Sequence, residues 1–177
     1  MLLEGKVALG TGGSSGIGRS AALTLAREGA VVVVADVLVE DGEETVRLIE
    51  EKGGNGRFLN CDVRNKSQVE EAVNKTVEVY GALHCAFNNA GIEGRFAYAT
   101  DFEEEEWNDI VDTNLKGVWL CMKYEVLQML KQGGGTIVNT ASVGGLVGIQ
   151  GLAPYAASKG GVVQLTKTLA LEYAQSN

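Results

Sequence analysis

Short apolar runs alternate along the chain with longer stretches whose apolar residues recur every three or four positions. The runs have the length of strands, and the longer stretches have the period of amphipathic helices. Strands are predicted at residues 6–9, 31–35, 57–59, 83–87 and 136–139. Helices are predicted at residues 16–28, 41–52, 66–80, 103–130, with allowance for one break, and 154–174. Strands joined by crossover helices lie parallel, so the pattern predicts an α/β fold of three layers, a doubly wound parallel sheet with helices on both faces.

The breaks between these elements are rich in Gly and Asn, which is typical of turns. They include Gly29, residues 53–56, Gly81 and residues 133–135. None resembles a linker between domains, and 177 residues with 45% apolar content suffice for one core. We therefore expect residues 1–177 to form a single domain. The acidic run at residues 103–106 is interpreted as a helix start, where carboxylates oppose the positive end of the helix dipole.

The formal net charge of -8 argues against a nucleic-acid surface, because binding phosphates requires clustered Lys and Arg. No apolar run approaches the ~20 residues that span a bilayer, and the first residues, MLLEGK, do not resemble a signal peptide. We expect a cytoplasmic protein with a small-molecule partner, associated with neither nucleic acid nor membrane.

Cysteine and histidine give little support to metal or hydrolytic chemistry. Cys61, Cys85 and Cys121 lack the paired spacing of a metal site or a disulfide framework, so we expect three thiols and no metal. His84 is the only histidine, and its apolar surroundings indicate a partly buried strand residue. A serine hydrolase is disfavoured as well, since Ser142 lies outside any G-x-S-x-G sequence.

A glycine-rich turn, TGGSSGIG, follows the first predicted strand and leads directly into a helix. Its glycines are spaced G-x-x-x-G-x-G. Glycine permits a tight turn and lets backbone N–H groups approach a pyrophosphate at the helix N-terminus. The turn therefore indicates a Rossmann-type dinucleotide-binding domain. Its predicted cofactor-binding residues are Gly12, Ser14, Ser15, Gly16, Ile17 and Gly18.

Asp36 ends the second predicted strand, near the ~20-residue offset at which an acidic side chain meets the adenosine ribose. A carboxylate accepts hydrogen bonds from ribose hydroxyls but repels a 2′-phosphate, which favours NAD over NADP. No Arg or Lys follows Asp36 in the stretch VLVE, and Arg19 is assigned to surface pairing. Taken alone, the turn and Asp36 also fit an ordinary αβ turn followed by a solvated carboxylate.

Further motifs follow in order along the chain. They are CDV at residues 61–63, NNAG at residues 88–91, Asn114 within TNLKG, Ser142 within TASVGG, and YAASK at residues 155–159. With the glycine spacing, they make the whole chain resemble the short-chain dehydrogenase/reductase family. The most specific feature is a serine followed thirteen residues later by Y-x-x-x-K. The resemblance implies an oxidoreductase that moves a hydride between NAD(H) and an alcohol or ketone.

Tyr155 and Lys159 are four residues apart, so they share one face of the predicted helix. A nearby ammonium stabilises the phenolate, which makes Tyr155 a usable general acid and base. An isolated Y-x-x-x-K is more commonly an exposed pair on an amphipathic helix. The phosphate-binding turn, Asp36 and Ser142 favour the catalytic interpretation.

The resemblance implies a role for each of four catalytic candidates. Tyr155 exchanges a proton with the substrate oxygen, while Lys159 holds the nicotinamide ribose and tunes Tyr155. Ser142 hydrogen-bonds the substrate oxygen and so stabilises charge that develops in the transition state. Asn114 anchors a water that relays protons to Lys159.

The resemblance also implies that Asp62 and Val63 border the adenine and that the backbone of Asn89, Ala90 and Gly91 lines the adenosine half. The residue pattern alone also fits Asp62 as a turn or capping residue after a strand. In the family, the helices that carry Asn114 and Tyr155 form subunit interfaces. We therefore expect a homodimer or homotetramer.

Two features depart from the family pattern. Gly10 stands where relatives usually carry an apolar strand residue. A glycine in a strand costs roughly 0.5–1 kcal/mol of folding free energy, and the loss of a buried Val costs roughly 1.5–3 kcal/mol. We therefore expect Gly10 to be destabilising. The sequence also stops at Asn177, just after the helix of Tyr155. We expect a domain that lacks its last strands and the segment that covers the substrate, and low turnover if nothing else is present.

Two other functions stay open at this stage. An NADPH-dependent 3-oxoacyl-carrier-protein reductase shares the Ser, Tyr and Lys pattern, although Asp36 argues against it. An inactive, shortened module that binds nucleotides or forms oligomers is the other. Sugars, steroids, cyclic alcohols and acyl thioesters all fit as substrates.

Overall fold

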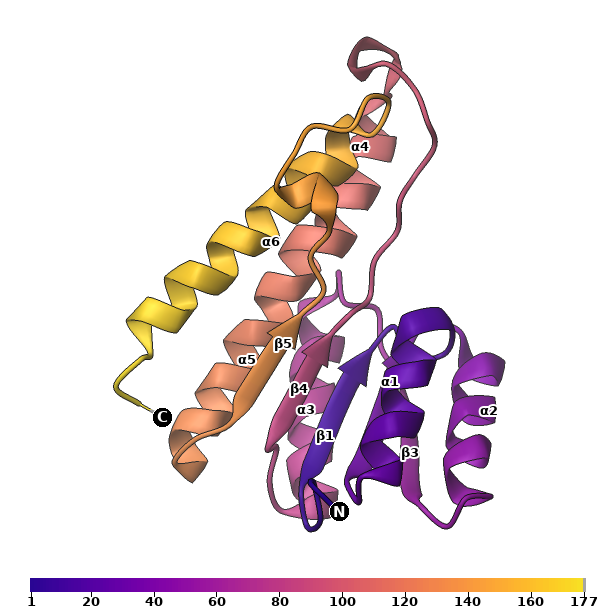
Figure 1. Cartoon of the computed structure of the whole chain (residues 1–177), viewed down its shortest axis with the longest axis vertical. Helices are drawn as coiled ribbons and strands as arrows, with labels where there is room; N and C mark the ends of the chain where they lie inside the picture. The colour runs from indigo at the N-terminus through magenta and orange to yellow at the C-terminus, as the bar shows by residue number, and fades with distance from the viewer. Residues whose placement is uncertain (177) are drawn as a thin grey trace.

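Five parallel strands form one sheet in the order β3-β2-β1-β4-β5 (Figure 1). The strands are β1 (Val7–Thr11), β2 (Val31–Asp36), β3 (Asn55–Asn60), β4 (Cys85–Asn88) and β5 (Thr136–Asn139). The computed structural model describes residues 1–176 of the chain. The strand order reverses between β1 and β4, and open sheets of this type bind ligands beyond the carboxyl ends of the strands at that point.

The predicted doubly wound fold is confirmed, and the five strands lie within a few residues of their predicted positions. Two details differ. Asn55 and Gly56, predicted as loop, pair with Val31 and Val32 at the start of β3. β4 begins at Cys85, so His84 precedes the strand, and the ring Nδ1 of His84 accepts a hydrogen bond from the Val7 N–H at 2.9 Å.

Within the described residues, six α-helices connect and cover the strands: α1 (Gly16–Arg27), α2 (Val39–Glu50), α3 (Lys66–Tyr80), α4 (Glu104–Val111), α5 (Gly117–Gln132) and α6 (Ala153–Glu172). The predicted break in the fourth helix is a π-helical turn, η2 (Asp112–Lys116), between α4 and α5. Glu103 and Glu106 form a capping box at the start of α4, so the acidic run begins a helix as predicted. None of these helices, within the described part of the chain, is long and apolar enough to cross a membrane.

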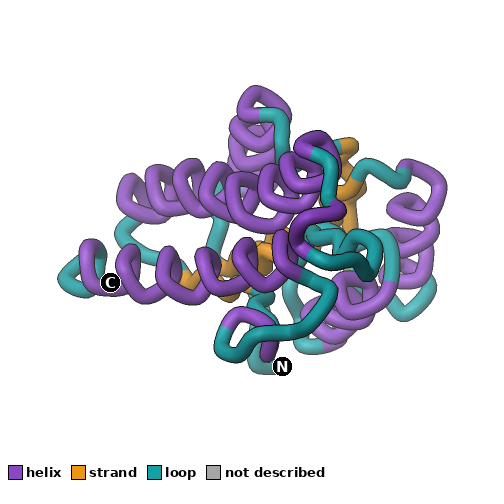
Figure 2. Tube along the Cα trace, turned by 90° about the horizontal axis from the view of Figure 1, so that it is seen from above, coloured by secondary structure: helices purple, strands orange, loops and turns teal. Residues whose placement is uncertain are grey.

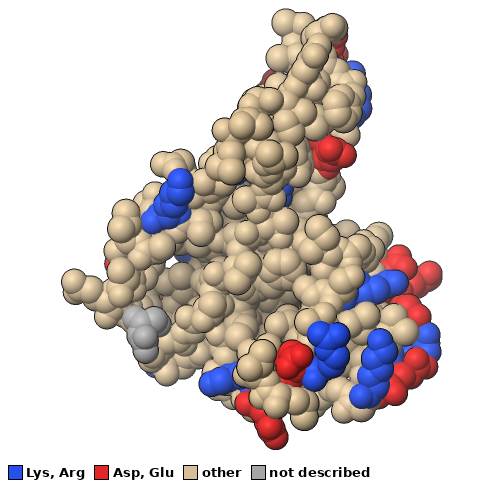
Figure 3. Space-filling view, in the orientation of Figure 1, with Lys and Arg blue, Asp and Glu red and all other residues tan. Residues whose placement is uncertain are grey.

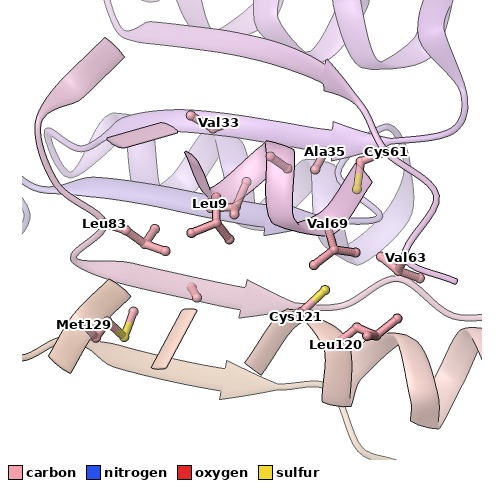
Figure 4. Close-up of a cluster of buried hydrophobic side chains, with 13 residues drawn as sticks. Leu9, Val33, Ala35, Cys61, Val63, Val69, Leu83, Leu120, Cys121 and Met129 are labelled. Carbon is pink, nitrogen blue, oxygen red and sulfur yellow. The ribbon is translucent and has the colours of Figure 1, made fainter. Parts of the chain in front are cut away.

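Alternating side chains of the central strands fill two cores. Val33 of β2 packs with Leu9 against α3 and α5 (Figure 4). Val32 and Val34 point to the opposite face and pack against α1 and α2. Val32, Val33 and Val34 are inaccessible to solvent, which is the burial expected of a central parallel strand.

The long helices α5 and α6 lie side by side next to β5 (Figure 2). Val162 of α6 packs against Val118 and Met122 of α5. The N-terminal half of α6 lies beyond the carboxyl ends of the strands (Figure 1).

Gly10 lies in β1 between Val34 and Phe87 of the neighbouring strands. A Cβ placed on Gly10 would have no described atom within 4 Å. The strand therefore has room for a side chain that the sequence does not supply.

Candidate active site

A cavity of about 680 Å³ opens at the crevice between β1 and β4. The β1–α1 turn, the ends of β2 and β3, and residues 89–93 line one side, and Tyr155 and Lys159 of α6 line the other. The surface is hollowed between the part formed by α1 and α2 and the part that contains α6 (Figure 3). Its volume is within the range of cofactor and ligand sites.

The glycine turn at the floor of this cavity depends on the absence of side chains. Gly12 has a φ of +64°, and a Cβ there would lie 2.8 Å from the Cα of Ala90. A Cβ on Gly18 would overlap the carbonyl oxygen of Gly12. The two glycines thus let the first turn of α1 pack directly on the ends of β1 and β4.

The N-terminus of α1 is open to the cavity. Ser15 occupies the N-cap position but makes no side-chain capping hydrogen bond, and the first turn contains no acidic residue. Gly16 and Ile17 both line the cavity. The free N–H groups of a helix N-terminus attract anions, so this end of the cavity fits the pyrophosphate of a dinucleotide.

Two residues of the predicted cofactor-binding turn, Ser14 and Gly18, are not among the described residues that line the cavity. Ser14 is fully buried, and its hydroxyl donates to the carbonyl of Leu38 at 3.1 Å. Ser14 and Gly18 therefore stabilise the turn without lining the cavity, Ser14 by hydrogen bonding and Gly18 by close packing.

Asp36 lies at the cavity edge with its carboxylate fixed by three backbone N–H groups. Oδ2 accepts from Ser14 at 3.0 Å, and Oδ1 accepts from Val37 and Leu38 at 2.7 and 3.1 Å. A carboxylate has about four acceptor positions, so Asp36 can still accept from a ribose hydroxyl. Arg19 is paired as predicted, with Thr45 and Asp41 of α2.

Asp62 both turns the chain and lines the cavity. Its Oδ1 accepts a hydrogen bond from the Arg64 N–H at 2.9 Å. The Arg64 guanidinium donates to the same carboxylate and lowers the pKa of Asp62. Arg64 also reaches Asp109 of α4 at 3.1 Å. Val63 and Cys61 complete this side of the cavity, where burial raises the pKa of the Cys61 thiol to about 12 and keeps it neutral.

Thr11 organises the segment that follows β4. Its hydroxyl oxygen accepts from the N–H groups of Asn89 and Ala90 at 3.0 and 3.2 Å. The Asn89 side chain donates in turn to the Gly12 carbonyl at 3.3 Å. Sequence analysis did not select Thr11, although its place at the carboxyl end of the first strand is the signal that would have identified it.

Lys159 is buried, with 3% of its surface exposed, beside Tyr155. Its Nζ lies 5.8 Å from the centroid of the Tyr155 ring and donates to the carbonyl of Thr140 at 2.8 Å. Burial lowers the pKa of Lys159. The structure therefore brings together the two residues that the sequence placed on one helix face, and it adds Thr140, at the end of β5, as the group that orients the ammonium.

Asn114 lies behind the cavity wall, within the π-helical turn η2. Its side chain donates to the Ile92 carbonyl and accepts from the Ile92 N–H, both at 2.8 Å, and also donates to Ser158 at 3.2 Å. A Cβ on Gly91 would be 3.1 Å from Asn114 Oδ1 and 3.5 Å from Lys159 Nζ. The side-chain amide of Asn114 and the ammonium of Lys159 therefore both lie close to Gly91.

Ser142 is not among the described residues that line the cavity. Its hydroxyl accepts from the Gly144 N–H at 3.1 Å and caps the short 3-10 turn η3 (Val143–Gly145). This turn packs on α6, since a Cβ on Gly145 would be 2.7 Å from the main chain of Lys159. Ser142 thus lies near the lysine without joining the group around Tyr155.

A buried carboxyl of α5 supports the carboxyl ends of β4 and β5. Glu125 of α5 is 1% exposed, and its Oε2 accepts from the Asn88 side chain at 2.9 Å. The same amide group donates to Asn139 at the end of β5 at 3.0 Å. Burial raises the pKa of Glu125 to about 7.

Comparison with known proteins identifies a family with this arrangement. A profile described as short chain dehydrogenase matches residues 6–177. The chain is 46% identical over 169 residues to a cyclohexanol dehydrogenase of Acinetobacter sp. (strain SE19), covering 96% of this chain and 67% of the relative. It is 42% identical over 177 residues to the 3-oxoacyl-[acyl-carrier-protein] reductase FabG of Thermotoga maritima, covering 100% of this chain and 72% of the relative.

A crystal structure of an NAD+-bound xylitol dehydrogenase superposes with a TM-score of 0.97 at 36% identity. The match covers 100% of this chain and 68% of that one. The chain spans about two thirds of the length of these relatives.

Proposed function

This chain belongs to the short-chain dehydrogenase family of oxidoreductases, and we propose that it transfers a hydride between NAD(H) and an alcohol or ketone. The observation that carries the proposal is a single cavity that joins the open N-terminus of α1, Asp36, Tyr155 and Lys159. One end of it suits a dinucleotide, and the other holds a phenol beside a buried ammonium.

Tyr155 is the proposed general acid and base. When an alcohol is oxidised, the phenolate of Tyr155 takes the hydroxyl proton; when a ketone is reduced, the phenol returns it. Lys159, whose Nζ lies 5.8 Å from the centroid of the Tyr155 ring, is proposed to hold the nicotinamide ribose beside Tyr155. Bound NAD+ supplies the acceptor for the hydride that leaves the carbinol carbon.

Ser142 and Asn114 are proposed to assist Tyr155. The Ser142 hydroxyl accepts from Gly144, which leaves its own O–H free to donate to a substrate oxygen. Asn114, fixed by Ile92 next to Lys159, is suited to hold a water that exchanges protons with the ammonium.

The proposed cofactor is NAD and not NADP. The Asp36 carboxylate lines the cavity and would repel a 2′-phosphate, and two arginines that could otherwise neutralise that phosphate are engaged elsewhere: Arg19 by Asp41, and Arg64 by Asp62 and Asp109. Asp62, Val63 and the segment from Asn89 to Gly91 would border the adenosine half. Calorimetric titration with NAD+ and NADP+ tests this, and equal or reversed affinities would refute it.

We also propose that residues 1–177 act as one domain and pair with a second copy as a homodimer or homotetramer. The one continuous sheet supports the first statement. Support for the second comes from the outer side of α5, which exposes Trp119, Leu127 and Leu130 to solvent. Sedimentation at several protein concentrations would show a monomer throughout if the pairing is wrong.

A 3-oxoacyl-carrier-protein reductase is the second candidate, because a relative with that name is 42% identical to this chain. It would use NADPH, which the surroundings of Asp36 disfavour. An inactive nucleotide-binding module is the remaining alternative. Production of NADH from secondary alcohols would dismiss both.

The experiment that tests the proposal measures NADH formation with a panel of secondary alcohols and either NAD+ or NADP+. Tyr155→Phe is expected to abolish turnover while leaving NAD+ binding intact, because it removes only the hydroxyl. Tyr173→Phe is the matched control: it removes a hydroxyl at the far end of the same helix, outside the cavity, and should leave turnover unchanged. Retained turnover in Tyr155→Phe would overturn the assignment.

A further inference from the structure

Two loops rise from the cavity and join at the far end of the molecule. Residues 89–98 follow β4, and residues 140–152 connect β5 to α6 (Figure 1). The Ala97 N–H donates to the Gly151 carbonyl at 3.0 Å, and the Phe96 ring lies against Gly151, where a Cβ would be 2.8 Å from it. The loops therefore form one continuous structure, which we call the tip lobe (residues 92–98 and 143–152).

The tip lobe stands next to Tyr155. Ile92 and Glu93, which begin its first loop, line the same cavity as Tyr155 and Lys159. Its second loop packs on α6 through Gly145, opposite the main chain of Lys159. A substrate whose carbinol group reaches Tyr155 must therefore place the rest of its atoms against this lobe.

Apolar side chains of the tip lobe are exposed to an unusual extent. Phe96 is 69% exposed, Leu146 is 73% and Val143 is 64%. Large apolar side chains that lie close together on a surface mark a binding site more often than scattered ones do. These side chains belong to the two loops that Ala97 and Gly151 join, so the lobe beside the cavity presents hydrocarbon surface.

Charged groups of the tip lobe are few, and its arginine is already paired. Residues 143–152 contain none, and residues 92–98 contain Glu93 and Arg95. Arg95 donates to both carboxylate oxygens of Glu106 and stacks on Phe102 at 5.1 Å. The face of the upper part of the molecule seen in Figure 3 is largely without charged side chains, whereas Lys, Arg, Asp and Glu gather over α1 and α2.

We infer that the site selects uncharged, largely hydrocarbon alcohols and ketones and rejects those that carry a phosphate, a carboxylate or an acidic carrier protein. The inference rests on the proposed function, whose substrate it specifies. An anionic group placed in the tip lobe would lose water without gaining a cation, and Glu93 would repel it. A hydrocarbon ring placed there would cover exposed apolar surface.

The test compares cyclohexanol with hydroxycyclohexanecarboxylate, which differ by one carboxylate on the same ring. Binding of each to the protein saturated with NAD+ is measured by ligand-observed NMR, and kcat and KM are measured alongside. We expect cyclohexanol to bind at least about 30-fold more tightly, because the carboxylate would be desolvated without a partner. Tighter or equal binding of the carboxylate, or no binding of cyclohexanol, would overturn the inference.

A pair of variants assigns the preference to the tip lobe. Leu146→Arg places a cation there and should reduce the preference for the neutral compound at least about fivefold, mainly through binding and KM. Leu171→Arg makes the same change at an 82% exposed leucine at the other end of α6 and should leave the preference unchanged. If both variants behave like the wild type, the inference is wrong.

The binding measurement separates this inference from the proposed function. If cyclohexanol binds selectively but no alcohol is oxidised with either cofactor, hydride transfer is refuted and the binding preference stands. If both alcohols are oxidised with similar kcat/KM and similar affinity, hydride transfer stands and the preference is refuted.

Discussion

The cavity is bordered by two regions: the cofactor wall, made of the β1–α1 turn and the carboxyl ends of β2 and β3, and the tip lobe. The two regions hold their residues in different ways. On the cofactor wall, Asp36 accepts three backbone N–H groups and Thr11 accepts two, so that wall is fixed by short, directional bonds. The tip lobe is joined across its loops by the bond between Ala97 and Gly151, and it exposes apolar side chains. A diphosphate and a ribose need donors and acceptors at fixed positions, whereas a hydrocarbon needs only a surface to cover. Substitutions in the tip lobe are therefore expected to change substrate preference without changing cofactor binding.

The largest difference between the walls is expected from adding one methyl group to each. Gly18→Ala pushes a Cβ into the Gly12 carbonyl, so it should lower the free energy of unfolding by about 3 kcal/mol and weaken NAD+ binding at least about 100-fold. Calorimetric titration and denaturant unfolding measure the two effects.

Gly148→Ala is the matched change in the tip lobe. A Cβ there has no described atom within 4 Å, so both quantities should stay near those of the wild type. Equal effects of the two substitutions would show that the walls do not differ in packing.

Glu125 supports both walls, because Asn88 links it to the end of β4 and, through Asn139, to the end of β5. Its pKa is about 7 in the folded protein and 4.5 as the ordinary value, so the folded state keeps a proton that the unfolded state has released. The free energy of unfolding should therefore fall as the pH rises from 4.5 to above 7, by roughly 3 kcal/mol in all.

Glu125→Gln removes this titration while keeping a polar group of the same shape. Unfolding by urea at a series of pH values should show that the difference between wild type and variant changes across that window. Glu78→Gln, at an exposed position of α3, should follow the wild type. A difference that is constant with pH would contradict the assigned protonation of Glu125.

Asp36→Asn is expected to act on the cofactor wall alone. Losing the charge that accepts ribose hydroxyls should weaken NAD+ binding about 10-fold to 100-fold and NADP+ binding much less. Asp101→Asn, at an exposed position outside the cavity, should change neither affinity by more than about twofold. If Asp36→Asn weakened both cofactors equally, Asp36 would serve the fold and not the choice of cofactor.

The smallest expected effect is a gain in stability away from both walls. Gly10→Ala fills unoccupied space in β1 and removes the flexibility of a strand glycine, so it should raise the free energy of unfolding by about 0.5–1 kcal/mol. Thermal unfolding measures this, and NAD+ affinity should not change. A lower stability would mean that the open space around Gly10 is required.

The sequence predicted the fold well because its signals are local. The apolar run of β2, the glycine turn and the acidic start of α4 each determine structure within a few neighbouring residues. The π-helical turn at Asn114 was foreseen only as a break, since its form depends on hydrogen bonds to Ile92 and Ser158, which are distant in sequence.

Site residues at motif positions could be selected from the sequence, but their contacts could not. Thr11 and Thr140 hold Asn89 and Lys159 through hydrogen bonds to residues that are distant in sequence. Ser14 was assigned to the cofactor and proves to hold the β2–α2 connection, because its side chain points to Leu38. Such assignments depend on side-chain direction, which residue spacing does not determine.

The central claim is that Tyr155 mediates hydride transfer between an alcohol and NAD+. It is tested most directly by incubating the protein with NAD+ and cyclohexanol deuterated at the carbinol carbon, then measuring deuterium in the NADH by mass spectrometry. The account predicts one deuterium in each NADH formed by the wild type, and no deuterated NADH from Tyr155→Phe, which still binds NAD+. Unlabelled NADH from the wild type, or undiminished transfer by Tyr155→Phe, would contradict it.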